Sequence, residues 1–416
     1  MNKIKSFIAT ILPGLFLIGL NIGTGSVTAM AKAGANYGLS LTWTIAISCY
    51  ITYFLINVFG KYTLVTGETA LYAFRKHIHQ VVGLFFIVAL GINVCGSVVG
   101  VMGIIADVCC EWSKNYIDGG ISGVWFAVFF IGFVYLLFWV GKTKSFEKIL
   151  AAIVALLSLC FLLNFFILMP PLGELFIGLV PSIPDTLNGT NDTPYLVIAS
   201  MVGTTVFSGL FIVRTILVKE SGWSIKDLKI QKRDAVIASI MMFVISISIM
   251  TSASGTLFKA GITLNSASQM LTLLEPLAGT FATTIFAVGI IAAGISSQFP
   301  NVILLPMLQS DYNQATLNFK SKQVRLIVLV ISSLGLVVPL THAPPILLMI
   351  ASQAFGALLL PFTVGCMLYL GNKKDLMKTH LFGMTTNITM VLILLFAIFM
   401  SFNGLKGVFP LISVHF

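Results

Sequence analysis

Glycine and hydroxyl residues gather deep inside an apolar run near the start of the chain. Gly23, Thr24, Gly25 and Ser26 follow one another within the apolar residues 7–30. Glycine costs about 1 kcal/mol against alanine inside a helix, so a clustered pair favours an interruption. At bilayer depth a broken helix is tolerated only where the freed backbone lines a cavity or is buried in protein. We therefore expect half of a binding site here, with close packing of another helix on the small residues as the alternative.

A second cluster of the same kind lies in the middle of a later apolar run, residues 195–218. Its candidate site residues are Thr204, Thr205, Phe207, Ser208 and Gly209. Corresponding interrupted segments in the two halves of a chain are the best sequence pointer to a transporter site at the bilayer midplane. The pair therefore favours a substrate site over a packing patch, and we expect the two breaks to face each other across a cavity.

The composition requires a membrane around these clusters. Of the 416 residues, 57% are hydrophobic and 9% are charged, which is more apolar than a soluble protein of this length needs. The formal net charge is +10, and the basic residues that carry it lie in short loops between apolar runs. This distribution indicates membrane topology rather than a nucleic-acid-binding surface. We expect an integral membrane protein in contact with the lipid bilayer, with no nucleic-acid partner and no enzymatic activity.

Hydropathy predicts eleven membrane spans. They cover about 7–31, 40–66, 82–109, 121–141, 148–170, 195–218, 235–258, 278–308, 324–341, 345–370 and 383–404. With the N-terminus in the cytoplasm, four of the 24 basic residues fall outside, at Lys32, Lys114, Lys259 and Lys406, and the other twenty fall inside. This bias predicts an N-terminus inside and a C-terminus outside. The expected location is a bacterial cytoplasmic (inner) membrane.

Four further stretches have a recognisable order and spacing. They are Leu64–Arg75 at the end of the second span, Ala33–Gly38 after the first, Phe286–Ser297 in the eighth, and Ser352-Gln353 with Leu360-Pro361-Phe362 in the tenth. They resemble, in that order, helix 2, the turn after helix 1, helix 8 and helix 10 of the NRAMP family of divalent metal transporters. The resemblance covers spans one to ten.

The resemblance implies the fold. It is an all-α polytopic membrane protein with a LeuT-type inverted repeat of 5+5 transmembrane helices plus an eleventh helix, and with helices 1 and 6 broken at the midplane. Residues 1–170 would form the first repeat, 171–370 the second, inverted repeat, and 371–416 the eleventh helix and a short tail. The resemblance also implies secondary active transport by alternating access, and we expect the protein to work as a monomeric unit.

The metal-binding motifs of the family are absent. The helix-1 motif DPGN falls on Gly23, Thr24, Gly25 and Ser26, so the ligand carboxylate is lost. The helix-6 motif MPH falls on Phe207, Ser208 and Gly209, and a second histidine of that helix aligns with Arg214. Only Gln353 keeps a residue type that lines the family's metal site. Since a dehydrated divalent cation needs anionic or soft ligands, we predict no metal site.

The remaining residues favour an anion. Unwinding helices 1 and 6 would expose the amino ends of two half-helices, with free N–H groups and positive dipole ends. The glycines would let an oxyanion approach the backbone, and the hydroxyl residues would donate hydrogen bonds. Phe207 limits the size. The residues therefore predict a small inorganic anion, and the resemblance to divergent NRAMP-related proteins that lack the metal ligands implies bicarbonate.

Other polar residues have two interpretations each. Ser296 and Ser297 would hold a coupling ion such as sodium, or serve helix packing; a proton is the other coupling ion considered, and no cofactor is predicted. Arg214 is interpreted as an anchor at the cytoplasmic surface, or as an electrostatic lure for an anion. Lys32 is expected to be solvated, or to attract anions on the outer side. Asn93 is expected to bond another helix.

Three other functions stay open. The first is a divalent metal cation (Mn/Fe/Mg-type) transporter with an atypical site, as the family resemblance implies. The second is a small amino-acid carrier, although a zwitterion needs more volume and an acceptor for its ammonium group. The third is a receptor that uses this fold for signalling, which the short tail after the last span disfavours.

Overall fold

The computed structural model describes residues 23–140, 143–185, 193–278 and 281–415. Within these ranges all regular elements are helices. The long ones are α2 (Thr24–Tyr37), α3 (Thr42–Thr66), α5 (Gln80–Ser113), α6 (Gly123–Val140), α7 (Thr143–Leu168), α9 (Pro194–Thr205), α10 (Ser208–Glu220), α11 (Leu228–Ala253), α14 (Ala282–Tyr312), α15 (Lys322–Ser333), α17 (Pro345–Gly371) and α19 (Met384–His415). Short helices connect them: α4 (Ala70–Ala73), α8 (Leu172–Ile177), α12 (Ala267–Met270), α13 (Glu275–Ala278), α16 (Val337–Thr341) and α18 (Lys374–Met377).

Eight segments in the described part of the chain are long and apolar enough to cross a membrane, and two shorter apolar helices lie at Gly123–Trp139 and Ala152–Leu168. Together they match spans two to eleven of the prediction. The first predicted span is represented by α2, and its earlier half lies outside the described residues. The all-helical membrane class is therefore confirmed. The division into two five-helix repeats stays a prediction.

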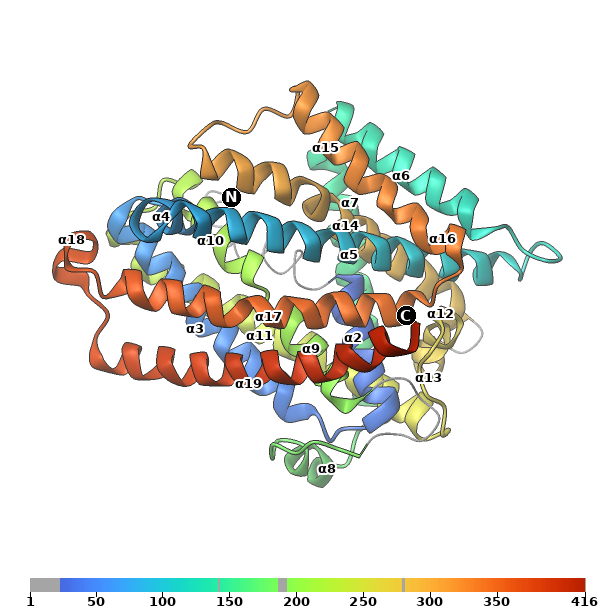
Figure 1. Ribbon diagram of the computed structural model, residues 1–416. Coiled ribbons are helices and arrows are strands. Elements are labelled where there is room, and N and C mark those ends of the chain that lie inside the picture. Colours follow the sequence, from blue (N-terminus) through green and yellow to red (C-terminus); the bar gives the residue numbers. More distant parts are fainter. Residues whose placement is uncertain (1–22, 141–142, 186–192, 279–280, 416) are drawn as a thin grey trace, which may run out of the picture.

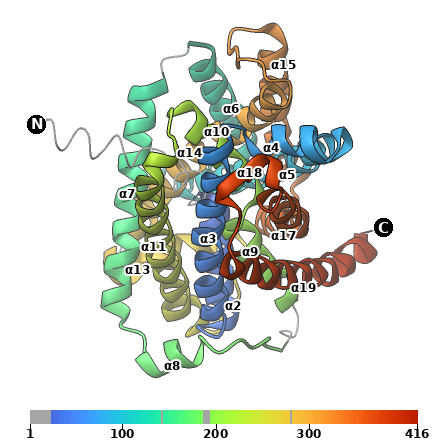
Figure 2. The same cartoon turned by 90° about the vertical axis from the view of Figure 1, so that its left-hand side faces the viewer.

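The α9–α10 segment is the centre of the bundle. In its most apolar part 94% of the residues are buried, against 33% for the peripheral helix α19. In both views α9 and α10 lie among α2, α3 and α17, while α19 follows α17 on one flank and α6 and α15 lie together on another (Figures 1 and 2). An apolar helix with almost no lipid contact can give its surface to a site instead.

The predicted break in helix 6 is confirmed. α9 ends at Thr205, Val206 and Phe207 are non-helical, and α10 begins at Ser208. Three β-branched residues in a row, Thr204 to Val206, weaken the helix because their χ1 angles are restricted. The Val206 N–H still bonds the Val202 carbonyl at 2.7 Å, and the next helix restarts with Leu210 N–H on the Phe207 carbonyl at 3.0 Å.

A glycine just before the break lets two helices touch. A β-carbon on Gly203 would overlap the backbone carbonyl of Gln353 on α17. Glycine allows such close approach because it has no side chain. The packing interpretation of the small residues therefore holds for Gly203, one residue before the part that faces the cavity. Site and packing patch are neighbours in this structure rather than alternatives.

The ninth span is not one helix. α15 ends at Ser333, the residues Leu334–Leu336 form a 3₁₀ turn, and α16 continues to Thr341. His342 then adopts a left-handed backbone conformation, with φ of 55°, before α17 begins at Pro345. The hydropathy pattern cannot show this interruption, because a 3₁₀ turn keeps the same apolar residues as the helix around it.

Candidate functional site

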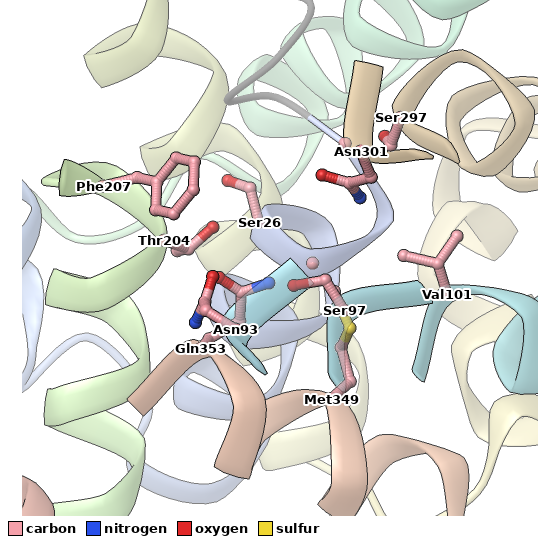
Figure 3. A pocket seen from close by; sticks show the side chains of 12 residues that line it. Ser26, Asn93, Ser97, Val101, Thr204, Phe207, Ser297, Asn301, Met349 and Gln353 are labelled. Atoms are coloured by element: carbon pink, nitrogen blue, oxygen red, sulfur yellow. The ribbon is translucent and has the colours of Figure 1, made fainter. Parts of the chain in front are cut away.

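A small cavity lies where the first turn of α2 meets the break between α9 and α10. Its volume is about 40 Å³, room for roughly three water molecules, since a cavity needs about 10–15 Å³ to hold one. It is lined from α2, α5, the α9–α10 break, α14 and α17 (Figure 3), by Gly23, Gly25, Ser26, Asn93, Ser97, Val101, Thr204, Phe207, Ser297, Asn301, Met349 and Gln353. The two predicted clusters thus contribute to one cavity.

Seven of the predicted site residues line this cavity. They are Gly23, Gly25, Ser26, Thr204, Phe207, Ser297 and Gln353. In Figure 3 the hydroxyl groups of Ser26 and Thr204 and the ring of Phe207 lie on one side, and Asn301 with Ser297 on the other. Their roles in substrate binding stay predictions.

The remaining predicted site residues lie outside the cavity lining. The Thr205 carbonyl accepts a hydrogen bond from Thr52 at 2.8 Å, and the Ser208 hydroxyl accepts one from Thr363 at 2.9 Å. A β-carbon on Gly209 would lie 2.5 Å from the ring of Phe207. Thr24 is fully buried and Ser296 is half-buried. The amino end of α10 therefore contributes its capping residue Phe207 to the cavity, but not its first helical residues Ser208 and Gly209.

The amino end of α2 gives the cavity its polarity. Gly23 is the residue before the helix, and the first intrahelical bond runs from Val27 N–H to the Gly23 carbonyl at 3.1 Å. The N–H groups of Thr24, Gly25 and Ser26 therefore have no acceptor within the helix. No acidic residue occupies the first turn, so the partial positive charge of the helix end is uncompensated there.

Two glycines allow the side chains of other helices to reach this turn. A β-carbon on Gly23 would lie 2.8 Å from the β-carbon of Ser297 and overlap its hydroxyl oxygen. A β-carbon on Gly25 would lie 2.5 Å from Gln353 Nε2 and overlap the methyl group of Met349. Gly23 has ordinary extended dihedral angles, so space and not conformation requires glycine at both positions.

Five lining residues were not predicted as site residues: Asn93, Ser97, Val101, Asn301 and Met349. Asn93 donates to the Ser352 carbonyl at 2.8 Å, and Ser352 returns a bond to the Asn93 carbonyl at 3.2 Å. The predicted interhelical bond of Asn93 is confirmed, and its side chain also lines the cavity. One sequence signal was available for Asn301: it follows Pro300, which cannot donate to the carbonyl of Ser296 and so frees an acceptor inside a span.

Arg214 contradicts both of its predicted interpretations. Its side chain is 0% exposed. The guanidinium pairs with Asp234 at 2.5 Å (Nη1 to Oδ2) and donates to Gln231 Oε1 from Nε at 3.1 Å. Gln231 in turn donates to the Ile56 carbonyl at 2.9 Å, so the group ties α10 to α11 and α3. The interpretation as a surface anchor or an anion lure was wrong because the partner, Asp234, lies on another helix, where the pattern of one span cannot show it.

Lys32 is also buried rather than solvated, with 1% of its surface exposed. Its ammonium group donates to the Leu264 carbonyl and to Asn265 Oδ1, the latter at 2.8 Å. The Leu264 N–H donates to Asn36 Oδ1 at 3.1 Å. Lys32 and Asn36, one turn apart on α2, therefore fix both backbone groups of one residue in the loop before α12. The expected solvation of this lysine was wrong, because the pattern of one span cannot show the loop that covers it; the attraction of anions stays a prediction.

The donor set of the cavity is neutral. Its lining residues offer hydroxyl and amide groups, backbone groups and the thioether of Met349, and no carboxylate, imidazole or thiol. In the described ranges as a whole, no group of three His, Cys, Asp or Glu side chains is arranged to hold a metal ion. A divalent cargo would therefore meet no compensating negative charge from these residues.

Comparison with known proteins identifies relatives. The chain matches the family described as "Natural resistance-associated macrophage protein-like" (Nramp) over residues 14–406. It is 23% identical to "Divalent metal cation transporter MntH" of Clostridium acetobutylicum, over 54% of this chain and 53% of that protein. It is 21% identical to "Natural resistance-associated macrophage protein 2 homolog" of Dictyostelium discoideum, over 88% of this chain and 57% of that protein. The chain thus spans little more than half the length of these curated relatives.

Solved structures share the fold. A manganese transporter of Eremococcus coleocola superposes with a TM-score of 0.75 at 17% identity, covering 97% of this chain and 87% of that one. Mhp1, a nucleobase-cation-symport-1 family transporter, superposes in its inward-facing conformation with a TM-score of 0.65 at 14% identity, covering 96% of this chain and 90% of the other. The predicted LeuT-type fold is therefore confirmed. Since the family match extends over residues 14–406, the chain belongs to the Nramp family, a family of transporters and not of enzymes.

Proposed function

We propose that this Nramp-family protein carries a small inorganic anion, with bicarbonate as the first candidate, by alternating access. One observation supports the proposal above all: the amino end of α2 opens on a small cavity whose lining side chains are all uncharged. Exposed N–H groups and the positive end of a helix dipole stabilise an anion. The hydroxyl groups of Ser26, Thr204 and Ser297 can add hydrogen bonds.

The electrostatic argument disfavours a bare divalent cation. Moving a dication into a low-dielectric interior is prohibitive unless anionic or soft ligands replace its water. The cavity has one soft atom, the sulfur of Met349, and no acid. The helix end adds a repulsive partial charge. The same features lower the free energy of an anion, whose charge has the complementary sign.

A divalent metal cation is the second candidate, and the comparisons favour it over bicarbonate. Relatives of the chain carry the name divalent metal cation transporter, and the Eremococcus neighbour is a manganese transporter. A hard cation such as magnesium keeps several of its waters when bound. Asn93, Asn301 and Gln353 could hold such water. The small volume of the cavity favours either ion over an amino acid.

Ligand-dependent stability of the purified protein tests the proposal. A ligand that binds only the folded state raises the free energy of unfolding by about 2.7 kcal/mol at a hundred times its Kd. We expect bicarbonate to raise the melting temperature of the detergent-solubilised protein, while manganese and magnesium chloride leave it unchanged. The Gly25→Val variant, which closes the approach to α2, is the control and should not respond. Stabilisation by a metal and not by bicarbonate would favour the second candidate.

Four details complete the proposal. The coupling ion would be sodium or a proton. Ser297 lies beside the first turn of α2, and its hydroxyl oxygen would be a ligand for sodium there. The basic residues favour a cytoplasmic N-terminus. A bacterial cytoplasmic membrane is the proposed location, and a monomer the proposed working unit.

A further inference from the structure

A second and larger cavity lies along α5 and α17, which are two of the helices that line the substrate cavity. This cavity, called the vestibule here, has a volume of about 470 Å³. Its lining includes Ala106, Asp107 and Cys110 of α5, Pro345 of α17, and His342 and Asn265 from two loops. On the substrate cavity, the same two helices present Val101 and Met349. Both cavities are therefore lined by α5 and α17, and the vestibule residues lie farther toward the carboxyl end of α5 and the amino end of α17.

Along each of these helices the two linings are about one to one and a half turns apart. Val101 and Ala106 are five residues apart on α5, and Met349 and Pro345 are four residues apart on α17. At 1.5 Å rise per residue these steps measure about 7.5 Å and 6 Å. Residues four apart share one face of a helix and residues five apart do not, so the two linings come together on one helix face at Met349 and Pro345 of α17.

Met349 lines the substrate cavity about one turn of α17 from Pro345, which lines the vestibule. It is 1% exposed and lies between two glycines on different helices. A β-carbon on Gly100 of α5 would lie 2.7 Å from its sulfur, and one on Gly25 of α2 would overlap its methyl group. In Figure 3 its side chain extends toward α5 below Ser97. A methionine has three rotatable side-chain bonds and no branch, so it can leave such a slot without moving the backbone.

We propose that Met349 is the gate between the vestibule and the substrate cavity, and that it sets what can pass between them. The proposal rests on the transport function above only in calling the inner cavity a substrate cavity. The glycines at positions 25 and 100 form the seat of the gate, because any side chain there would displace it. A closed methionine separates the cavities; a rotated one joins them.

Thiol labelling tests the gate without any substrate. The reporter is Ser97→Cys, which lines the substrate cavity, in the full chain reconstituted in liposomes. A membrane-impermeant charged methanethiosulfonate reagent is added to one side, then to the other, and labelled peptides are identified by mass spectrometry. The native Cys110 lines the vestibule and shows which side the vestibule faces. From that side, we expect the reporter to react at least ten times faster with Met349→Ala than with methionine.

Two variants control for size and for a general loosening of the core. Met349→Leu keeps the volume and should leave the reporter slow. Met367→Ala removes the same atoms from another buried methionine of α17 and should also leave it slow. If the double variant Ser97→Cys/Met349→Ala does not fold, Thr204→Cys replaces Ser97→Cys as the reporter and Met349→Val replaces Met349→Ala as the variant with the opened gate.

Three results would overturn the proposal. The first is an equal reporter rate with methionine and with alanine at position 349. The second is acceleration by Met367→Ala as large as that by Met349→Ala. The third is a Cys110 that is unreactive from both sides, since the vestibule would then not be connected to solvent. None of these results depends on which ion is carried, so a failure of bicarbonate binding leaves the gate intact and a failure of the gate leaves the ion proposal intact.

Discussion

Gly23 and Ser297 share one contact that joins the start of α2 to the middle of α14. A β-carbon on Gly23 would lie 2.8 Å from the Ser297 β-carbon and overlap its hydroxyl group. Position 23 is where the aspartate of the family's DPGN motif falls. Ser297 on α14 occupies the space that a side chain at this position would need. A glycine at position 23 and a serine at position 297 therefore fit together, whereas an aspartate at position 23 would not fit beside this serine.

The contact determines how a carboxylate should be restored. Gly23→Asp alone would clash with Ser297, so its failure would say nothing about charge. The double variant Gly23→Asp/Ser297→Gly removes the obstacle, and aspartate and asparagine are both favourable residues before a helix. We expect Gly23→Asp/Ser297→Gly to lose bicarbonate uptake. Its neutral isostere, Gly23→Asn/Ser297→Gly, should take up bicarbonate several times faster than the aspartate variant. Equal uptake by the two variants would show that no anion approaches this turn.

Bulk at Gly25 should matter more than the loss of a hydroxyl group. Gly25→Val places a side chain where Met349 and Gln353 now lie, and it would also push an oxyanion outward by about an ångström, beyond the hydrogen-bond distance of about 3 Å; a melting temperature close to that of the wild type is therefore required before its uptake is compared. We expect Gly25→Val to abolish uptake nearly completely. Ser26→Ala should reduce uptake only several-fold, because a net hydrogen bond contributes about 0.5–1.5 kcal/mol. Uptake assays of the two variants at equal protein density measure the difference, and the reverse order of effects would contradict binding at the backbone.

The buried ion pair of α10 and α11 should be essential for stability as a pair. Arg214→Met leaves Asp234 charged, buried and without its main partner, and such removals cost about 3–5 kcal/mol. The double variant Arg214→Met/Asp234→Leu should recover much of that loss, since apolar replacement of a buried pair is often close to neutral. Melting curves in detergent measure this, with Lys219→Met, an exposed lysine of α10, as a control that should change little. A double variant as unstable as the single one would contradict the pairing.

The loop between α3 and α4 should give a small pH-dependent contribution to stability. Burial disfavours the Glu68 carboxylate, but hydrogen bonds from Lys76 and His77, both at 2.7 Å, outweigh it and lower the pKa of Glu68. A lowered folded-state pKa stabilises the fold above the ordinary carboxyl pKa, and this contribution is lost as pH falls through the lowered value. We expect Glu68→Gln to lower the melting temperature by about 1–3 °C at neutral pH. The difference should vanish in acid; a difference that persists there would show that packing and not charge is responsible.

The sequence allowed the membrane class to be predicted, and both predicted clusters contribute residues to one cavity. The break at Val206 and Phe207 was predictable because the residues around it, among them the β-branched Thr204 and Thr205, are neighbours in the sequence. α2 begins at Thr24, directly after the predicted glycine, but the residues that precede it lie outside the described part of the chain, so the break in helix 1 stays a prediction. Local conformational preferences are read from neighbours in the sequence, and the observed break in helix 6 depends on them.

The environment of the charged residues was not predictable. Asp234 is twenty positions from Arg214, and Leu264 is 232 positions from Lys32. Neither pairing follows from hydropathy, which assigns a lone basic residue to the nearest surface. The side chains of α5 and α14 that complete the cavity were missed for the same reason. The proline before Asn301 was the one local signal for that residue, and Met349 has no local signal that distinguishes a cavity-facing residue from a packed one.

Uptake by reconstituted protein tests the central claim most directly. Liposomes containing the wild-type chain or Gly25→Val are given radiolabelled bicarbonate at alkaline pH, where little dissolved carbon dioxide can bypass the protein, and radiolabelled manganese in parallel. The proposal predicts bicarbonate uptake above empty liposomes for the wild type, none for Gly25→Val, and manganese at the background level for both. Manganese uptake by the wild type without bicarbonate uptake would contradict it.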